Sequence, residues 1–280
     1  MKSSNNSIAC PLAQAAVQFP DMPALESSVR QVTYKQYHNC VGTIAERLAS
    51  EGVHSGDRVA IVAETCIEYV MLLMAIIRSG AIACPLSLRN PASLLKEQIA
   101  SLNAKTVVQD RDLPDGISSK ECHSMAIGQL CHNHDLNSKP DMNVRLPLDC
   151  DASILFTSGS ANKPKAVVHT IGNHYYSALG SNENINLAPG DRWMLSLPLY
   201  HVGGLAVPFR AMLAGAAVFV PSCGHDSLAE EIAVSGITHL SIVPAQLSRL
   251  LDQMNSTNTR LPQLKAVLVG GDAVGPAMVA

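Results

Sequence analysis

The sequence predicts an α/β protein with two β/α lobes, whose largely parallel sheets are covered by helices. First, short β-branched runs alternate with helical patterns along most of the chain, which is typical of parallel crossovers. Second, 47% of the 280 residues are apolar and only 15% are charged, as expected for sheets that are buried on both faces. Third, the alternation is interrupted from about residue 110 to residue 151, where Pro, Gly, Ser, Asn and His dominate.

The first half, residues 1–150, is expected to form one lobe, with the connecting segment at its end. Thr33 and Gln36 form a capping-box pattern, and the apolar spacing after them predicts a helix that Gly52 ends. The next elements are, in order, a strand at 58–63, a buried helix at 65–79, a strand at 82–86, a helix at 91–101 and a strand at 106–109.

The second half, residues 151–280, resumes the alternation and is expected to form the other lobe. Strands are predicted at 153–157, 193–198, 216–221, 238–244 and 264–269. Helices are predicted at 227–235 and 245–254, and Ser227 with Glu230 gives the first of them a capping-box start.

The charge balance and the apolar runs exclude several classes of partner. With 20 Lys and Arg against 23 Asp and Glu, the net charge of −3 implies no basic face, so we expect no nucleic acid partner. The longest apolar run, residues 69–77, is ended by Arg78 and is too short to span a membrane. Eight scattered cysteines indicate buried thiols in a reducing compartment, and hence a cytoplasmic location.

A group of cysteines and histidines in the connecting segment could suggest a metal site. Its members are Cys122, His123, Cys131, His132 and His134. Their spacing fits no common zinc pattern, and the stretch around them is polar. A surface segment is therefore the favoured interpretation, and no metal-ligating side chain is predicted.

A loop of small and hydroxyl residues follows the strand predicted at 153–157. It consists of Thr157, Ser158, Gly159, Ser160, Ala161, Asn162, Lys163, Pro164, Lys165 and Ala166. Small residues let backbone N–H groups approach an anion, the three hydroxyls can donate to phosphate oxygens, and Lys165 can neutralise charge. The order of a Walker A loop, G-x-x-x-x-G-K-[ST], is absent. Composition alone leaves two equal interpretations, a phosphate-binding loop and a polar hairpin without a ligand.

This segment resembles the phosphate loop of the adenylate-forming acyl- and aryl-CoA ligases, T-S-G-[ST]-[ST]-G-x-P-K-[GA]. The resemblance implies a catalytic role for Lys165, and it implies that the phosphates of ATP are bound by Thr157, Ser158, Gly159, Ser160 and Lys165. Two positions depart from the pattern. Ala161 replaces a hydroxyl residue, and Asn162 replaces a glycine, although Asn also tolerates left-handed backbone angles. These departures could weaken the phosphate grip or slow the first half-reaction, but they leave Lys165 in place.

Three other segments carry the same resemblance, which covers about residues 20–280. Residues 193–204 look like the family's acyl-pocket segment, residues 264–272 like its adenine-facing strand and turn, and residues 79–91 like the usual end of its first half. The family's chemistry implies that a carboxylate attacks the α-phosphate of ATP and that a thiol, normally that of coenzyme A, then displaces AMP. Magnesium would bridge phosphate oxygens. The expected small-molecule partners are therefore ATP, Mg²⁺, coenzyme A and an aryl dicarboxylic acid.

The acid is suggested by three segments that are most similar to the o-succinylbenzoate–CoA ligases of menaquinone biosynthesis. They are residues 164–170 (PKAVVHT), 196–205 (SLPLYHVGGL) and 240–251 (LSIVPAQLSRLL). Two alternatives of the same class stay open, namely another aryl- or acyl-CoA ligase and an adenylation domain that feeds a carrier protein. An alternative from another class is a non-catalytic nucleotide-binding fragment.

Arg210 is a candidate for acid recognition on a physical argument of its own. It lies in the otherwise apolar stretch 204–213, where a guanidinium is costly unless it is paired. o-Succinylbenzoate has two carboxylates and only one is activated, so Arg210 could pair with the free one. The alternative is that Arg210 reaches solvent or an internal Asp or Glu.

His201, Gly203 and Gly204 are assigned to the acid pocket. The two glycines leave room for a ligand, and the resemblance implies that His201 is a catalytic residue that positions the aryl group or the reacting carboxylate. His201 is not expected to act as a general base, because the attacking carboxylate is already ionised.

Gly270, Gly271 and Asp272 follow the last predicted strand and are assigned to adenine binding. The glycine pair allows a close backbone approach to a flat ring, with an ordinary turn as the alternative. Asp272 could instead serve only as a helix N-cap. His169 and His174 are interpreted as structural residues.

Several pieces that family members carry further downstream do not occur in the 280 residues. They are an acidic turn motif, a ribose-binding Asp, a hinge and a small C-terminal domain with a catalytic Lys. We therefore expect an N-terminal part of a longer enzyme, with an incomplete second lobe and without the small domain, that is nearly inactive alone. A homo-oligomer is possible, since uncovered apolar surface favours association.

Overall fold

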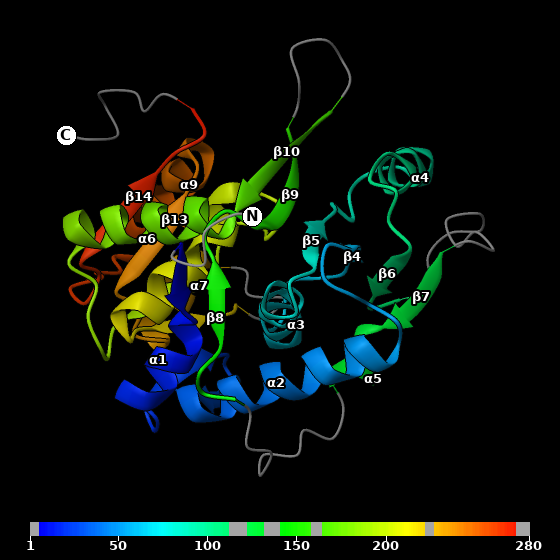
Figure 1. Ribbon diagram of the computed structural model, residues 1–280. Coiled ribbons are helices and arrows are strands. Elements are labelled where there is room, and N and C mark those ends of the chain that lie inside the picture. Colours follow the sequence, from blue (N-terminus) through cyan, green and yellow to red (C-terminus); the bar gives the residue numbers. More distant parts are fainter. Residues whose placement is uncertain (1–5, 112–121, 132–140, 158–163, 222–226, 273–280) are drawn as a thin grey trace.

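The structure is a computed structural model that describes residues 6–111, 122–131, 141–157, 164–221 and 227–272. Within these residues the strands form two six-stranded sheets and one two-stranded pair. Helices lie between the sheets and on their outer faces, so layers of helix and sheet alternate (Figure 1). The predicted α/β class is therefore confirmed.

The first sheet has the strand order β10-β9-β5-β4-β6-β7. Its strands are β4 (Arg58–Val62), β5 (Ile82–Pro85), β6 (Thr106–Gln109), β7 (His123–Ala126), β9 (Asp151–Thr157) and β10 (Lys165–Thr170). Neighbouring strands are parallel, except that β9 and β10 form an antiparallel hairpin. The polar loop of the sequence connects these two strands.

The second sheet has the order β14-β13-β11-β12-β2-β3. Its strands are β2 (Pro23–Glu26), β3 (Gln31–Thr33), β11 (Arg192–Met194), β12 (Ala217–Phe219), β13 (His239–Ile242) and β14 (Ala266–Val269). All neighbours are parallel apart from the antiparallel pair β2 and β3. Each sheet therefore takes strands from both sides of residue 150, and the division of the chain into lobes at that position stays a prediction.

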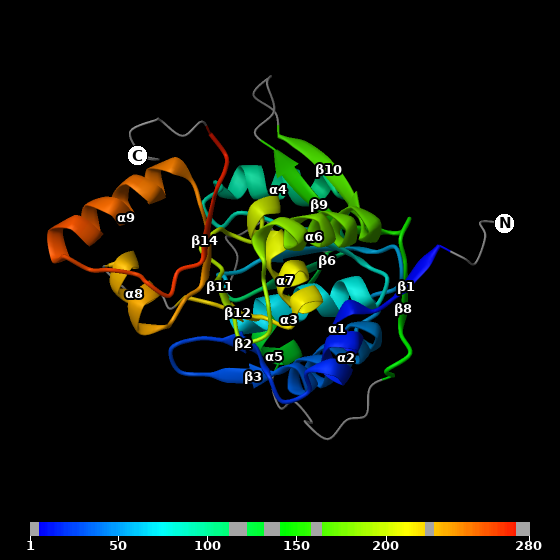
Figure 2. The same ribbon diagram turned by 90° about the vertical axis from the view of Figure 1, so that its left-hand side faces the viewer.

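The helices are placed by the alternation of side chains along each strand. In β4, Val59 and Ile61 face the core between the sheets, whereas Ala60 and Val62 face the outer side. The helices that contribute to the shared core are α1 (Pro11–Gln18), α2 (Tyr34–Ser50), α3 (Ile67–Arg78), α5 (Ile127–Cys131), α6 (Ile171–Ile185) and α7 (Val202–Ala214). The outer helices are α4 (Ala92–Ser101) on the first sheet and α8 (Leu228–Val234) and α9 (Pro244–Thr257) on the second. Figure 2 shows α8 and α9 across the second sheet from α7.

The structure differs from the sequence-based expectation mainly in the connecting segment, 110–151. Its described parts contain β7, α5 and β8 (Arg145–Pro147), and β8 pairs with β1 (Ser7–Ala9). The prediction of a loose segment was thus wrong there. Strand β7 lies at the edge of the sheet, and only its Met125 is buried. Its sequence therefore contains no apolar run that would predict a strand.

Two wider expectations concern membranes and metals. Among the helices of the described residues, none is long and apolar enough to cross a membrane. In the same part of the chain, no group of three or more His, Cys, Asp or Glu side chains could hold a metal ion. His123 forms an ion pair with Glu51 at 3.1 Å and Cys131 is buried, whereas His132 and His134 lie outside the described residues.

Candidate active site

A cavity of about 640 Å³ lies where the carboxyl ends of β9, β11, β13 and β14 meet. Ligands of open α/β sheets bind at such strand ends, and the volume is typical of a small-molecule site. Most of the lining is apolar, from Leu155, Phe156, Val167, Leu197, Val202 and Val243. The remaining lining residues are Thr157, His169, Tyr200, His201, Gly203, Gly270 and Gly271.

The ends of the polar loop lie at this cavity because the β9–β10 hairpin opens there. Thr157 pairs with Lys165 in the strand register, and its hydroxyl Oγ1 is 3.5 Å from the Lys165 carbonyl oxygen. Thr157 lines the cavity, and the side chain of Lys165 is exposed beside it. Ser158, Gly159 and Ser160 lie outside the described residues, so their predicted contacts with phosphate stay predictions.

His201 lies immediately before α7, at the helix N-cap position. Its carbonyl accepts the Leu205 N–H at 2.9 Å, and its ring packs edge-on against Tyr200 with 4.6 Å between ring centroids. Partial burial of the ring, and secondly the charge of Arg89, lower the pKa of His201, which favours the neutral imidazole. A neutral ring at a cavity rim can position a ligand by hydrogen bonding.

The two glycines after His201 have different roles. Gly203 lines the cavity, and an added Cβ would meet only Leu197 Cδ1, at 3.0 Å. Gly204 is buried outside the lining, and a Cβ there would lie 2.2 Å from the Pro198 carbonyl oxygen. The expected room for a ligand thus concerns Gly203, while Gly204 lets the start of α7 approach the preceding backbone.

A second cavity, of about 320 Å³, shares a wall with the first. Phe156, Thr157, Tyr200 and His201 line both cavities. Arg89, which lies shortly after β5, lines the second one and acts electrostatically on His201. Sequence reasoning missed Arg89 and Tyr200; the available signal was a cationic side chain just beyond the carboxyl end of a parallel strand.

Gly270 and Gly271 end β14 and line the main cavity from the second sheet. The Gly270 N–H donates to the Ile242 carbonyl at 3.1 Å, so the turn is tied to β13. Gly271 has a φ of +89°, which an L side chain rarely adopts. Asp272 is exposed and is not part of the lining among the described residues.

Arg210 lies further along α7 and does not line either cavity in the described part of the chain. Its guanidinium carbon is 5.2 Å from the centroid of the Trp193 ring, which is fully buried. Its Nε atom is buried and has no hydrogen-bond partner among the described residues, and burial lowers the pKa of the side chain. The contact that the structure gives Arg210 is therefore a cation–π contact, and its pairing with a carboxylate stays a prediction.

His169 lines the main cavity from β10 and is half-buried. Its Nδ1 atom is buried and has no hydrogen-bond partner among the described residues. The ring centroid lies 5.5 Å from that of His174, whose Nε2 is 2.8 Å from Ser153 Oγ and whose ring stacks on Phe209 at 4.7 Å. His174 is thus fixed inside the core, whereas the polar partner of the His169 ring among the described residues is the backbone of Val167 on its own strand.

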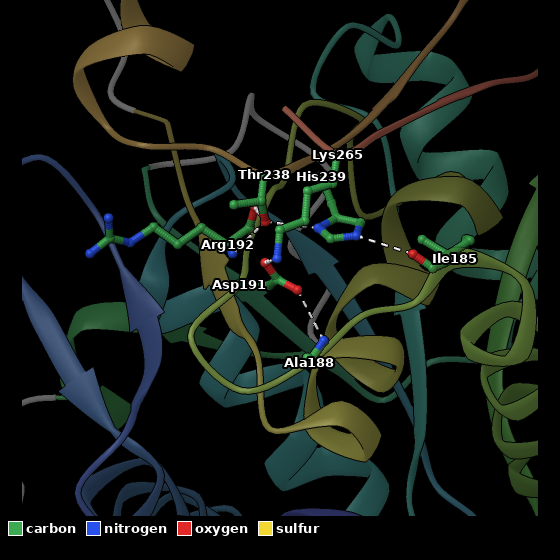
Figure 3. Close-up of polar contacts among 7 residues, drawn as sticks. All are labelled: Ile185, Ala188, Asp191, Arg192, Thr238, His239 and Lys265. Carbon is green, nitrogen blue, oxygen red and sulfur yellow. Dashed lines mark hydrogen bonds and ion pairs between the residues drawn. The ribbon is translucent and has the colours of Figure 1, made fainter. Parts of the chain in front are cut away.

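The amino ends of β11, β13 and β14, at the other end of these strands from the cavity, carry a network of polar groups (Figure 3). Asp191 accepts hydrogen bonds from Lys265 Nζ at 2.7 Å and from the Ala188 N–H at 3.0 Å. Burial opposes ionisation of Asp191, but these two bonds keep its pKa below the ordinary value. The Thr238 hydroxyl accepts the Arg192 N–H at 2.9 Å and lies 2.8 Å from His239 Nδ1.

Comparison with known proteins gives consistent matches along most of the chain. A family model described as AMP-binding enzyme matches residues 12–280. The chain is 30% identical over 267 residues to a 2-succinylbenzoate–CoA ligase of Bacillus cereus, covering 95% of this chain and 53% of that protein. The chain thus spans about half the length of this curated relative.

Two solved structures of one enzyme show the same fold. The o-succinylbenzoate coenzyme A synthetase (MenE) from Bacillus subtilis, in complex with ATP and magnesium ion, matches with a TM-score of 0.87 and 25% identity; 98% of this chain and 57% of that chain are covered. Its complex with the acyl-adenylate intermediate OSB-AMP matches with a TM-score of 0.85 and 24% identity, over 98% of this chain and 56% of that chain. The expected large-domain fold is therefore confirmed.

Proposed function

Because the chain belongs to the AMP-binding enzyme family, we propose that it forms the ATP- and acid-binding part of an o-succinylbenzoate–coenzyme A ligase. In this reaction the acid's carboxylate attacks the α-phosphate of ATP, giving an acyl-adenylate and pyrophosphate. The thiol of coenzyme A then attacks the acyl carbon and displaces AMP. The first step is needed because a carboxylate has no good leaving group, and AMP supplies one.

The observation that carries this proposal is the composition of the main cavity wall. Thr157 at the start of the polar loop and the Gly270–Gly271 turn line the same cavity as the apolar side chains of Leu155, Val167 and Leu197. We assign the loop, with Lys165, to the phosphates and the glycine turn to the adenine. The apolar wall is assigned to the aryl group, with His201 positioning the reacting carboxylate.

Magnesium fits this site as an ion carried mainly by the nucleotide. No carboxylate lines the main cavity in the described part of the chain, and the hydroxyls of Thr157 and Tyr200 are the side-chain oxygens there. Mg²⁺ usually keeps several waters and binds substrate phosphates with one or two protein oxygens. When bound, it would neutralise charge on the phosphates.

The choice of o-succinylbenzoate rests on relatives that are named 2-succinylbenzoate–CoA ligases. A cytoplasmic location is proposed with it, because Cys10, Cys40 and Cys84 are buried free thiols, as is usual in a reducing compartment. Another aryl- or acyl-CoA ligase remains the alternative.

Calorimetric titration of the 280-residue chain tests the proposal. The ligands are AMP and three acyl-sulfamate analogues of acyl-AMP, carrying o-succinylbenzoate, benzoate or a fatty acid. We expect the o-succinylbenzoyl analogue to bind at least about tenfold more tightly than AMP and than the other two analogues. Equal affinity for all three acyl groups would favour the alternative ligase, and no gain over AMP would reject an acid site.

Lys165 provides a second test, with Lys105 as a matched exposed lysine remote from the cavity. Lys165→Ala should weaken ATP binding by about 10- to 100-fold, the value of a hydrogen bond to a charged group. AMP binding should change much less, because AMP lacks the β- and γ-phosphates. Lys105→Ala should leave both affinities unchanged, and an equal loss in the two variants would contradict the assignment.

A further inference from the structure

The β9–β10 hairpin forms one wall of the main cavity, and the polarity of its residue pairs changes along the hairpin. Its register pairs Thr157 with Lys165, Leu155 with Val167, and Ser153 with His169. Four residues separate Thr157 from Ser153, so His169 lies about 13 Å along the hairpin from the phosphate loop, at about 3.3 Å per residue. One phosphate and an aryl acid extend over a comparable length, so an acid that lies along the hairpin with its reacting carboxylate at the phosphate loop would reach His169 with its other end.

His169 differs from the other polar groups of this wall because no other side chain holds its ring by a hydrogen bond among the described residues; the backbone of Val167 on its own strand is the polar group that acts on it. Its Nδ1 is buried without a partner among the described residues. The histidine behind it, His174, is already bound to Ser153 and stacked on Phe209. A buried polar atom without a partner is uncommon and indicates a missing contact.

Few described side chains could neutralise an anion inside this cavity. Among the described lining residues only His169 and His201 can carry a positive charge. His201 lies at the wall shared with the second cavity and beside Arg89, near the loop end of the hairpin. Arg210 lies over Trp193, outside the described lining.

We propose that His169 binds the free carboxylate of a dicarboxylic aryl acid and thereby selects such acids over monocarboxylic ones. This inference rests on the proposed function, since it concerns the same cavity and the same acid. Val167, on the same face of β10, and Leu155 opposite it would hold the apolar body of the acid between the two ends. An apolar wall makes an unpaired second carboxylate costly, so a single partner suffices for discrimination.

Protonation of His169 should accompany binding. Burial lowers the pKa of His169 in the protein alone, and an adjacent carboxylate would raise it. The groups next to His169 are His174 from α6 and Ser153 from β9, and the other polar side chains that line the same cavity are Thr157, Tyr200 and His201. No described Asp or Glu lines the cavity, so the ligand itself must supply the negative charge.

The test compares two probes in calorimetric titrations of the 280-residue chain. One is the acyl-sulfamate analogue of o-succinylbenzoyl-AMP, and the other is its methyl ester at the free carboxylate. The ratio of their dissociation constants measures recognition of that carboxylate alone. We expect the wild type to favour the acid probe by about 10- to 100-fold, with a larger ratio at pH 6 than at pH 8.5.

Two substitutions at His169 and one elsewhere decide the outcome. His169→Gln and His169→Phe should bring the ratio to near one at both pH values, while the affinities for AMP and for the ester probe are retained. Arg210→Met separates this proposal from the competing prediction that Arg210 pairs with the same carboxylate: it should keep the wild-type ratio if His169 is the partner. Retained AMP binding shows that a variant is folded.

Several results would overturn the inference. They are an unchanged ratio in both His169 variants, a ratio that does not vary with pH in the wild type, and loss of the ratio in Arg210→Met instead. In each of these cases both probes still bind, so the proposed function survives. If the wild type binds AMP but neither probe better than AMP, the acid assignment and this inference fall together.

Discussion

The two ends of the strands in the second sheet, here called its amino edge and its carboxyl edge, differ in how their polar groups are paired. At the amino edge, the side chains of Asp191, Thr238 and His239 each have a hydrogen-bond partner within the protein (Figure 3). At the carboxyl edge the chain places a glycine turn, an exposed His201 and an apolar cavity wall. The hydrogen bonds at the amino edge therefore stabilise the sheet, while the carboxyl edge leaves hydrogen-bond donors and acceptors that a ligand can use.

This difference indicates where substitutions should affect stability and where they should affect binding. Removing a polar group that has hydrogen-bond partners inside the protein lowers stability, because those partners are then buried without hydrogen bonds. Groups that lack an internal partner cost little stability when removed, and their loss should appear in ligand affinity. Three stability predictions, from the largest effect to the smallest, test this contrast.

Gly204→Ala is expected to have the largest effect, although Gly204 lies beside the cavity. Its Cβ would lie 2.2 Å from the Pro198 carbonyl oxygen and 2.5 Å from that of Leu197, both backbone atoms. We expect a loss of at least about 4 kcal/mol in the free energy of unfolding, or no folded protein. Urea denaturation measures it. The matched variant Gly203→Ala, which meets only a flexible Leu197 methyl, should lose less than about 1 kcal/mol.

Asp191→Ala tests the amino edge. The side chain is 3% exposed and loses its bonds with Lys265 and Ala188, so we expect about 3 kcal/mol of destabilisation. Glu51→Ala, which breaks a half-exposed pair with His123, should cost at most about 0.5 kcal/mol. Folded Asp191→Ala protein should bind AMP with unchanged affinity, and a selective loss of AMP binding would contradict the division between the edges.

His174 predicts a pH dependence. Burial, and secondly His169, lower its pKa to about 4, whereas the unfolded value is 6.5. The unfolded chain therefore binds a proton first, so stability is fully present above pH 6.5 and is lost as pH falls toward 4. The loss from pH 7 to pH 5 should be about 2 kcal/mol for this group. The unfolding free energy of His174→Gln should fall less steeply over that range, and equal slopes would exclude this cause.

Much of the fold could be predicted from the sequence because its buried strands and capped helices have strong local signals. The capping box at Thr33 and Gln36 starts α2 as expected, and the predicted strand at 106–109 is β6. Strand β10 gave no such signal, since its first four residues are exposed and it is stabilised by its pairing with β9. Such elements depend on tertiary contacts that a local pattern does not contain.

The site residues stay predictions, and the structure shows which of them lie at the cavity. The Gly270–Gly271 turn and the loop ends at Thr157 and Lys165 were assigned mainly from the family resemblance, and they lie beside one cavity. Arg210 was selected for its charge in an apolar stretch, but the direction of α7 puts it over Trp193. His169 was interpreted as structural because no role could be assigned to it and no strand was expected at its position; its place on the cavity side follows from β10 and its register.

The pairing of β2 with β12 has a consequence for the order of folding. Leu25 lies opposite Val218 in this parallel pair, so β2 can pair only after β12, which is synthesised much later, has become available. Contacts between such distant segments are slow to form, and during synthesis the second sheet cannot close until β11 and β12 have left the ribosome. The first sheet lacks this delay in its centre, where β4, β5 and β6 follow one another closely. The protein should therefore acquire its first sheet early and its second late.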